Sequence, residues 1–392
     1  MINYIIIRQV NIYMHDIYFD SAATTKPSKV AIEAAFAAAN EYGNPSSSHF
    51  RGIAARKVIE NARKQVTSAL GCNEEELIFT GSGSESNNQA IIGIARARKK
   101  RSNVIISTDS EHPSVEQTLQ YLEKEGFKVI RFSTKVGNID IDELKESLKQ
   151  KVALISVMRA NNETGALYDI ANIRREIDNS GCGAVFHCDA VQGFLKTLNR
   201  TELVKYCDLV SISAHKINAL KGCGALFIKK GINLPAYILG GGQEHDLRSG
   251  TENTPAIAAF GAACDEWVSN RDRIGYITDL RDYAEVKISE ALGDRIVIHK
   301  PAQRICCILS IELIGVKSEV VLNYLSGEGI CVSAGSACSA HKRENRVLTA
   351  FGLAESEIDN TIRISFSYFN NREEVDLFVD VLKNATSLIG KI

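Results

Sequence analysis

The chain has 392 residues, 45% of them hydrophobic and 24% charged, which is long enough for a large buried core and two domains. Its 46 basic and 47 acidic residues leave a formal net charge of −1, which argues against a nucleic-acid partner. No apolar run approaches the ~18 residues of a membrane span. We therefore expect a globular protein with no membrane and no nucleic-acid partner.

Ten cysteines are scattered along the chain, and none of them forms a CxxC pair. The eight histidines show no HExxH-like spacing, so the sequence predicts no metal site. A chain of this size needs no disulfide bonds, and most of the cysteines are interpreted as small buried hydrophobes. This pattern favours a reducing, cytoplasmic location.

Between residues 76 and 230, short β-branched runs alternate with amphipathic stretches. We expect strands at residues 77–80, 104–108, 128–132, 153–157, 184–188, 209–213 and 225–229. We expect helices between them at residues 85–99, 113–125, 141–149 and 170–179. Such alternation predicts a mainly parallel seven-stranded sheet covered by helices on both faces.

After the turn Gly240-Gly241-Gly242 the pattern changes. It is helical from 255 to 292, and then combines antiparallel strands with further helices. The expected strands are 305–313 and 363–367, and the expected helices are 318–327 and 372–389. We therefore predict an α/β fold with a large domain at residues 16–262 and a smaller α+β domain at residues 263–392. Residues 1–15 either pack with the small domain or form an extension, and whether residues 1–13 belong to the native protein stays open.

Two polar side chains stand at the ends of predicted strands. Lys216 follows the strand at 209–213, and Asp189 follows another strand, 27 residues upstream of Lys216. An aldehyde cofactor needs a lysine amine for its Schiff base, and a pyridine ring that accepts electrons needs a carboxylate at its nitrogen. Open α/β sheets bind ligands at this edge. Taken alone, a buried core ion pair would explain the two residues equally well.

The segment Thr80-Gly81-Ser82-Gly83-Ser84 joins a predicted strand to a helix. Glycines let the backbone approach a ligand, and Ser84 together with the first N–H groups of the helix suits a phosphate. Ser213 and His215 are candidates for further phosphate donors. The segment is neither a P-loop nor a GxGxxG fingerprint, and a serine-capped helix start is an equally good interpretation.

Three further candidates lie in predicted loops. His112 can stack on a flat ring or transfer a proton, although a loop histidine is more often simply exposed. Asn162 offers an amide to a phenolate or carboxylate, or belongs to a plain asparagine-rich turn. Cys338 stands in a run of small residues, where an accessible thiol suits a nucleophile that must reach a substrate. As an isolated cysteine it would more often be inert.

Together these residues resemble the pyridoxal-phosphate-dependent cysteine desulfurases, in particular the NifS-like group I enzymes of the class V aminotransferase group. The matching stretches follow the family's order along nearly the whole chain: residues 18–25, 43–49, 82–88, 111–112, 161–165, 189–192, 213–216, 248–253, 335–338 and 363–365. Ten short motifs in order do not arise by chance. The resemblance implies the fold type I of pyridoxal-phosphate-dependent transferases.

The resemblance also implies a role for each residue around the pyridine ring. Lys216 carries the cofactor and acts as the base at the substrate Cα. Asp189 pairs with the ring nitrogen, and Gln192 approaches the ring hydroxyl. His112 stacks on the ring and takes part in catalysis.

The resemblance also implies which residues bind the cofactor phosphate and which residue contacts a second subunit. Ser84, Ser213 and His215 would hold the phosphate of their own subunit. Thr251, in the stretch 248–253, is expected to reach the phosphate of the partner subunit. The resemblance therefore predicts a homodimer with active sites at the subunit boundary.

The implied substrate is L-cysteine, whose carboxylate Asn162 and Arg363 would grip, since a guanidinium fork suits a carboxylate. The Cys338 thiolate would attack the substrate sulfur, which leaves a persulfide on Cys338 and releases alanine. A sulfur-acceptor protein, such as an iron–sulfur scaffold or a thiolation protein, would then take the sulfur. The sequence does not identify that protein.

Three stretches depart from the family's pattern: Gly81-Ser82-Gly83-Ser84, Ile217-Asn218-Ala219-Leu220 after Lys216, and the basic run His341-Lys342-Arg343-Glu344-Asn345-Arg346 after Cys338. The last of these leaves the identity of the acceptor open. A selenocysteine lyase or a class V aminotransferase on the same scaffold is the alternative, although an aminotransferase needs no loop cysteine. A third interpretation is a catalytically idle paralogue that serves as a scaffold.

Overall fold

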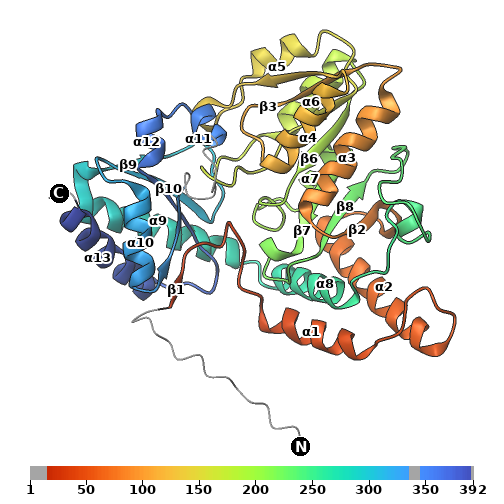
Figure 1. Cartoon of the computed structure of the whole chain (residues 1–392), viewed down its shortest axis with the longest axis horizontal. Helices are drawn as coiled ribbons and strands as arrows, with labels where there is room; N and C mark the ends of the chain where they lie inside the picture. Colours follow the sequence, from red (N-terminus) through yellow and green to blue (C-terminus); the bar gives the residue numbers. More distant parts are fainter. Residues whose placement is uncertain (1–15, 335–344, 390–392) are drawn as a thin grey trace, which may run out of the picture.

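The computed structural model describes residues 16–334 and 345–389 (Figure 1). A seven-stranded sheet with the order β2-β8-β7-β6-β5-β3-β4 forms the centre of its larger part. Strand β8 runs antiparallel to both of its neighbours, and the remaining pairs are parallel. In this order the strands are β2 (Leu77–Thr80), β8 (Gly224–Ile228), β7 (Leu209–Ser213), β6 (Val185–Asp189), β5 (Leu154–Ser156), β3 (Val104–Thr108) and β4 (Lys128–Phe132). The predicted mainly parallel seven-stranded sheet is confirmed.

Helices cover both faces of this sheet because successive strand residues point to opposite sides. Ile105 packs with the helices α3 and α4, whereas its neighbour Ile106 belongs to the larger core on the other face. The helices of this part are α1 (Lys29–Asn40), α2 (Phe50–Leu70), α3 (Gly83–Arg98), α4 (Pro113–Lys124), α5 (Ile141–Ser147), α6 (Ile170–Ser180), α7 (Glu202–Tyr206) and α8 (Thr254–Ser269). Short 3-10 turns connect several of them: η1 (Glu74–Glu76), η2 (Lys135–Gly137), η3 (Ala214–Lys216) and η4 (Glu244–Asp246).

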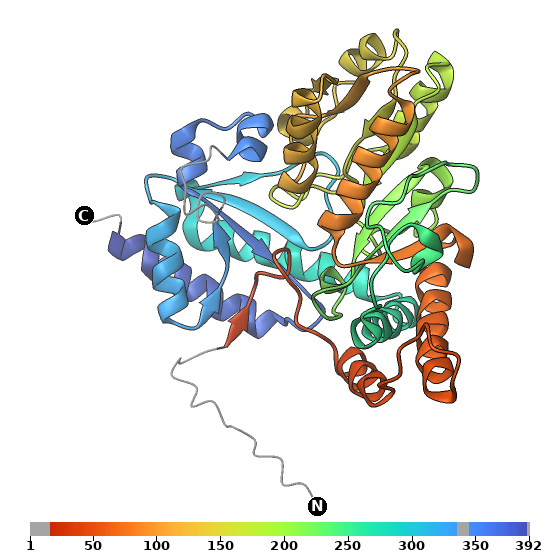
Figure 2. The ribbon, with the colours of Figure 1, turned by 45° about the vertical axis from the view of Figure 1, so that its right-hand side comes forward.

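The C-terminal part is built on a four-stranded antiparallel sheet. Its strand order is β12 (Ser333–Ala334), β13 (Thr361–Ser365), β10 (Ile308–Leu313) and β9 (Ile296–His299). The accompanying helices and turn are α9 (Arg273–Leu292), η5 (Gly293–Arg295), α10 (Ser318–Gly327), α11 (Arg346–Phe351), α12 (Glu355–Asp359) and α13 (Arg372–Ile389). The short strand β1 (Ile17–Tyr18) pairs in parallel with β11 (Ile330–Cys331), so β1 lies beside this part (Figure 2). The prediction for residues 1–15 lies outside the described residues.

The single helical stretch expected from 255 to 292 is divided in two. Asn270 caps the end of α8, and α9 begins at Arg273 after Asp272. Asparagine and aspartate favour caps over helix interiors, which explains a break at this polar run. The domain boundary that we predict at residues 262 and 263 falls inside α8.

In residues 16–334 and 345–389, no helix has both the length and the apolar composition needed to cross a bilayer. Nine cysteines lie in this portion, all of them as free thiols, and seven are buried. That burial agrees with their interpretation as small core residues.

Candidate active site

A cavity of about 430 Å³ lies at the carboxyl ends of β6 and β7. Strand β6 ends at Asp189, β7 ends at Ser213, and Lys216 follows in η3. The C-terminal part contributes Arg363 from β13. Nine of the eleven residues predicted for the site line this one cavity: Ser84, His112, Asn162, Asp189, Gln192, Ser213, His215, Lys216 and Arg363.

The other two predicted residues are not in the cavity. Thr251 is exposed and lines a separate surface hollow together with Tyr42. Cys338 lies outside the described residues. Its role as sulfur acceptor and the role of Thr251 toward a partner subunit therefore stay predictions.

The Lys216 amine is held at the cavity wall. Its Nζ donates to the backbone oxygens of Ala22, at 2.6 Å, and Ala23, at 2.7 Å. Burial, reinforced by repulsion from the nearby cations Lys196 and Arg363, lowers the pKa of Lys216 to about 7. A large fraction of this amine is therefore neutral near pH 7, which is the form that attacks a carbonyl.

The Asp189 carboxylate is fixed by two donors. Its Oδ1 accepts from the Val191 backbone N–H at 3.0 Å, and its Oδ2 accepts from the Asn87 amide at 2.7 Å. Asp189 is buried, so these bonds replace the water that it would have in solution. Sequence reasoning missed Asn87, although it stands inside the quoted stretch 82–88.

The same Asn87 amide connects Asp189 to His112. It donates to the Ser114 hydroxyl at 2.9 Å, and that hydroxyl lies 2.8 Å from His112 Nδ1. The Ser114 backbone N–H donates to the same Nδ1 at 3.1 Å. Nδ1 is therefore an acceptor, and the proton of the neutral ring sits on Nε2. Burial lowers the pKa of His112, a shift that Lys216 reinforces and Asp189 opposes, which favours this neutral ring.

The start of α3 forms an anion cradle. Ser82 caps the helix by accepting from the Glu85 backbone N–H at 3.1 Å. At Gly83 a Cβ atom would come within 2.5 Å of Val191 Cγ2, so only glycine fits. The Ser213 hydroxyl is buried and has no hydrogen-bond partner among the described residues, so it offers a donor to a ligand.

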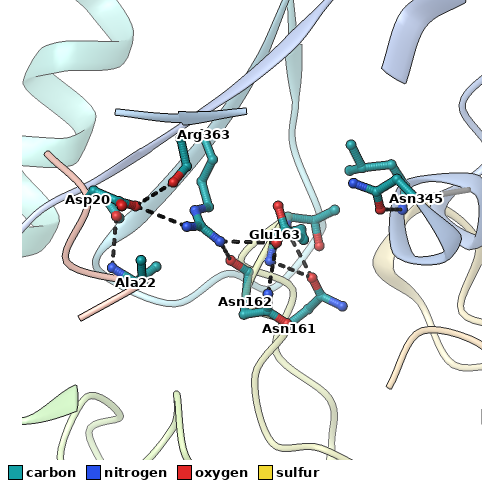
Figure 3. Close-up of polar contacts among 12 residues, drawn as sticks. Asp20, Ala22, Asn161, Asn162, Glu163, Asn345 and Arg363 are labelled. Carbon is teal, nitrogen blue, oxygen red and sulfur yellow. Dashed lines mark hydrogen bonds and ion pairs between the residues drawn. The ribbon is translucent and has the colours of Figure 1, made fainter. Parts of the chain in front are cut away.

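Arg363 is oriented by two acids (Figure 3). Its Nη1 donates to the Asn162 backbone oxygen at 2.9 Å and to Glu163 Oε1 at 3.1 Å. Its Nη2 donates to Asp20 Oδ1 at 3.0 Å. The side-chain Oδ1 of Asn162 is buried and has no partner in the described part of the chain. Asp20 and Glu163 were not predicted as site residues, although both stand inside the quoted stretches 18–25 and 161–165.

Strand β12 lies next to Arg363. Ser333 of β12 pairs in register with Arg363, and its hydroxyl donates to Asp20 Oδ1 at 2.7 Å. Asp20 Oδ1 therefore accepts from both Ser333 and Arg363.

The stretch of residues 217–220 after Lys216, which differs from the pattern of the resembled family, contains a left-handed turn. Asn218 adopts the left-handed backbone conformation, with φ of 66°. Asparagine tolerates this region better than most residues. Its backbone N–H donates to Thr25 Oγ1 at 2.8 Å, and its amide donates to the Lys26 oxygen at 2.9 Å. The turn therefore ties η3 to the N-terminal segment that also receives the Lys216 amine.

The sequence profile of the family described as aminotransferase class-V matches residues 17–378. The cysteine desulfurase of Trichormus azollae is 36% identical over 375 residues, which cover 94% of this chain and 92% of the relative. A solved NifS-like protein has a TM-score of 0.89 and 32% identity, covering 95% of this chain and 100% of that one. A structure described as SspA in complex with cysteine has a TM-score of 0.78 and 30% identity, covering 90% and 99%.

Proposed function

The chain belongs to the class V aminotransferase family, and from its place among the cysteine desulfurases we propose that it converts L-cysteine to L-alanine with pyridoxal phosphate as cofactor. The observation that carries this proposal is the cavity in which Lys216, Asp189 and Arg363 meet. A relative bound to cysteine supports the choice of substrate.

The residues of the cavity fit pyridoxal phosphate. The orphan hydroxyl of Ser213 and the glycine cradle at Gly83 suit the phosphate. Asp189, fixed by two donors, suits a protonated ring nitrogen, and Lys216 supplies the amine. When bound, the cofactor supplies an electron-accepting ring that stabilises negative charge at the substrate Cα.

Each residue then has a defined task. Arg363, together with the amide oxygen and nitrogen of Asn162, positions the substrate, with the guanidinium facing its carboxylate. The Lys216 amine takes the proton from Cα, for which a pKa of about 7 is well placed. His112, protonated at Nε2 in its neutral form, can donate a hydrogen bond from that atom.

Sulfur transfer is assigned to Cys338. Its thiolate forms a bond to the substrate sulfur while the bond between that sulfur and the substrate Cβ breaks. In balance, L-cysteine and the Cys338 thiol give L-alanine and a Cys338 persulfide. A sulfur-acceptor protein, of the iron–sulfur scaffold or thiolation type, then removes the outer sulfur. We place this reaction in the cytoplasm, where thiols stay reduced.

We also propose that the functional unit is a homodimer. Large apolar side chains are exposed around α1, among them Ile32, Phe36 and Tyr42, and exposed apolar patches mark interaction surfaces. Tyr42 and Thr251 line the same hollow, so a partner that covers the apolar surface also meets Thr251. This arrangement supports a role for Thr251 in the neighbouring subunit's site.

The test is to incubate the purified protein with L-cysteine and pyridoxal phosphate and to measure alanine and sulfide together. A desulfurase forms alanine and, with an added reductant, an equal amount of sulfide. Alanine that forms only when a keto acid is supplied, without sulfide, would favour an aminotransferase and contradict the proposal.

A further inference from the structure

The Glu163 carboxylate lies on the two donors that we assign to the carboxylate of the substrate (Figure 3). Its Oε1 accepts from the Asn162 side-chain nitrogen at 2.9 Å and from Arg363 Nη1 at 3.1 Å. Glu163 lines the same cavity, and its side chain is 19% exposed. A carboxylate of the chain itself therefore fills the position that the proposed function gives to the carboxylate of L-cysteine.

The backbone of Glu163 is fixed, so its side chain is the part that can leave these donors. Asn161 Oδ1 accepts from the backbone N–H groups of Glu163, at 2.9 Å, and of Thr164, at 3.0 Å. Gly165 follows with φ of 76°, and a Cβ atom there would come within 3.1 Å of Ile308 Cβ. The turn should therefore stay in place when the Glu163 side chain rotates within the cavity.

Arg363 has further contacts that hold it when Glu163 leaves. Its Nη1 also donates to the Asn162 backbone oxygen, at 2.9 Å, and its Nη2 donates to Asp20 Oδ1, at 3.0 Å. A terminal guanidinium nitrogen carries two N–H groups, so release of Glu163 frees one N–H on Nη1 and one on the Asn162 amide. Both point at one oxygen atom, so they are close enough together to bind a single incoming carboxylate.

Displacement of Glu163 also changes the balance of charge. The charged groups that act on Glu163 in the described part of the chain are Arg363 of β13, Asp20 after β1 and Lys216 of η3. Burial raises the pKa of Glu163, and Arg363 opposes this rise. The charge of Asp20 reinforces it, and that of Lys216 opposes it. A ligand carboxylate takes over the attraction of Arg363 and adds a negative charge, so ligand binding should be coupled to protonation of Glu163.

We propose that Glu163 is a placeholder for the substrate carboxylate, which covers Asn162 and Arg363 until a carboxylate ligand displaces it. This proposal rests on the proposed function, which assigns those two residues to the substrate. Because the donors are covered, every carboxylate ligand binds with an affinity reduced by the fraction of molecules in which they are free. Glu163 thus keeps small carboxylates out of the site at low concentration, whereas an amino acid gains further affinity through its amine.

The test is isothermal titration calorimetry of the protein loaded with pyridoxal phosphate, with three ligands. Propionate carries the carboxylate alone, L-alanine carries carboxylate and amine, and ethylamine carries the amine alone. In Glu163→Gln the neutral amide holds Arg363 less strongly than a carboxylate does. We expect propionate and L-alanine to bind about tenfold more tightly, by the same factor, which corresponds to donors covered in about 90% of wild-type molecules. The affinity for ethylamine should stay within twofold.

Proton uptake gives a second readout, which a purely structural role of Glu163 would not change. Titrations of propionate at pH 7 in buffers of different ionisation enthalpy measure the protons taken up on binding. The wild type should take up more protons than Glu163→Gln, because only the wild type has a carboxylate to protonate there. Its affinity for propionate should therefore increase more steeply than that of the variant as the pH falls.

Asp20→Asn is the matched control for charge. It removes a negative charge from the same guanidinium, but Asp20 contacts Nη2 and Glu163 still covers the shared donors, so the affinity for propionate should not rise. Glu163→Ala removes the carboxylate outright and should gain at least as much affinity as Glu163→Gln. If Glu163→Gln failed to fold, Glu163→Ala would carry the test, and proton uptake by the wild type needs neither variant.

The outcomes separate this proposal from the proposed function. Equal or weaker binding of propionate to the Glu163 variants would overturn the placeholder role, because Glu163 would then only support Arg363. An equal gain in Asp20→Asn, or a wild type that takes up no extra proton, would overturn it as well. The propionate titrations do not depend on the reaction, so a wild type that forms no alanine from L-cysteine would contradict the proposed function instead.

Discussion

The Lys216 amine should bind its aldehyde partner at neutral pH far faster than an ordinary lysine would. Burial and the neighbouring cations lower its pKa to about 7, so about half of the amine is neutral at pH 7. A lysine with the usual pKa of ~10.4 is neutral in roughly one molecule in a few thousand at that pH. The reactive fraction is therefore larger by roughly a thousandfold.

Replacing Lys196 with methionine tests the cause of this shift. Lys196 is buried, and its charge is the second-largest cause of the lowered pKa, after burial. Methionine keeps the length and removes the charge, so the pKa of Lys216 should rise but stay below that of an exposed lysine. The assay is the rate at which the apoprotein takes up pyridoxal phosphate, followed by absorbance between pH 5.5 and 10.

For the wild type we expect the uptake rate to rise about tenfold per pH unit below pH 7 and to level above it, since protonation removes the reactive form. The Lys196→Met curve should be displaced to higher pH. Lys205→Met, which removes an exposed charge on α7, serves as the control and should leave the curve in place. A wild-type midpoint near pH 10, or a variant curve displaced to lower pH, would refute the reasoning.

Three further predictions concern covalent chemistry and assembly. Borohydride reduction of the loaded protein should label Lys216 in peptide mapping, and a label on Lys221 would contradict the assignment. The Cys338→Ala variant should keep its absorbance spectrum and its spectral response to cysteine. Its rate of alanine production should fall by ~10²-fold or more, as when one positioned catalytic group is removed. If most of the activity survived, a lyase or an aminotransferase would be favoured. Light scattering should give a dimer, and Thr251→Val should weaken cofactor binding, whereas a fully active monomer would exclude a shared site.

Much of the fold could be predicted because its strands are buried on both faces. Such strands are continuous apolar runs bounded by polar turns, and the buried strands β2, β3 and β7 begin and end at the predicted residues. The edge strand β4 also has the predicted bounds, although it is only partly buried. The break between α8 and α9 was missed because the hydrophobic pattern continues across it. Only the caps at Asn270 and Asp272 signal the change.

The cavity could be predicted in part for a different reason. Residues at or just after the carboxyl ends of neighbouring parallel strands, such as Asp189 and Lys216, lie at one edge of the sheet, so their places in the sequence bring them together. Contacts between the larger part and the C-terminal part of the molecule cannot be predicted from the order of the strands. Asp20 and Arg363 are 343 residues apart, and only their shared membership of the quoted motifs could have linked them.

In the proposed reaction, Arg363 affects both the binding of the substrate carboxylate and the pKa of Lys216. A grip on a carboxylate needs a guanidinium that is already oriented, because ordering a long side chain on binding costs affinity. Asp20 and Glu163 provide that orientation by accepting from Nη2 and Nη1. The same guanidinium charge lowers the pKa of Lys216, while Asp20 partly opposes it. This cluster of charges therefore orients the group that would bind the substrate and also contributes, after burial and Lys196, to the pKa of the base, so a change at Asp20 should alter the two together.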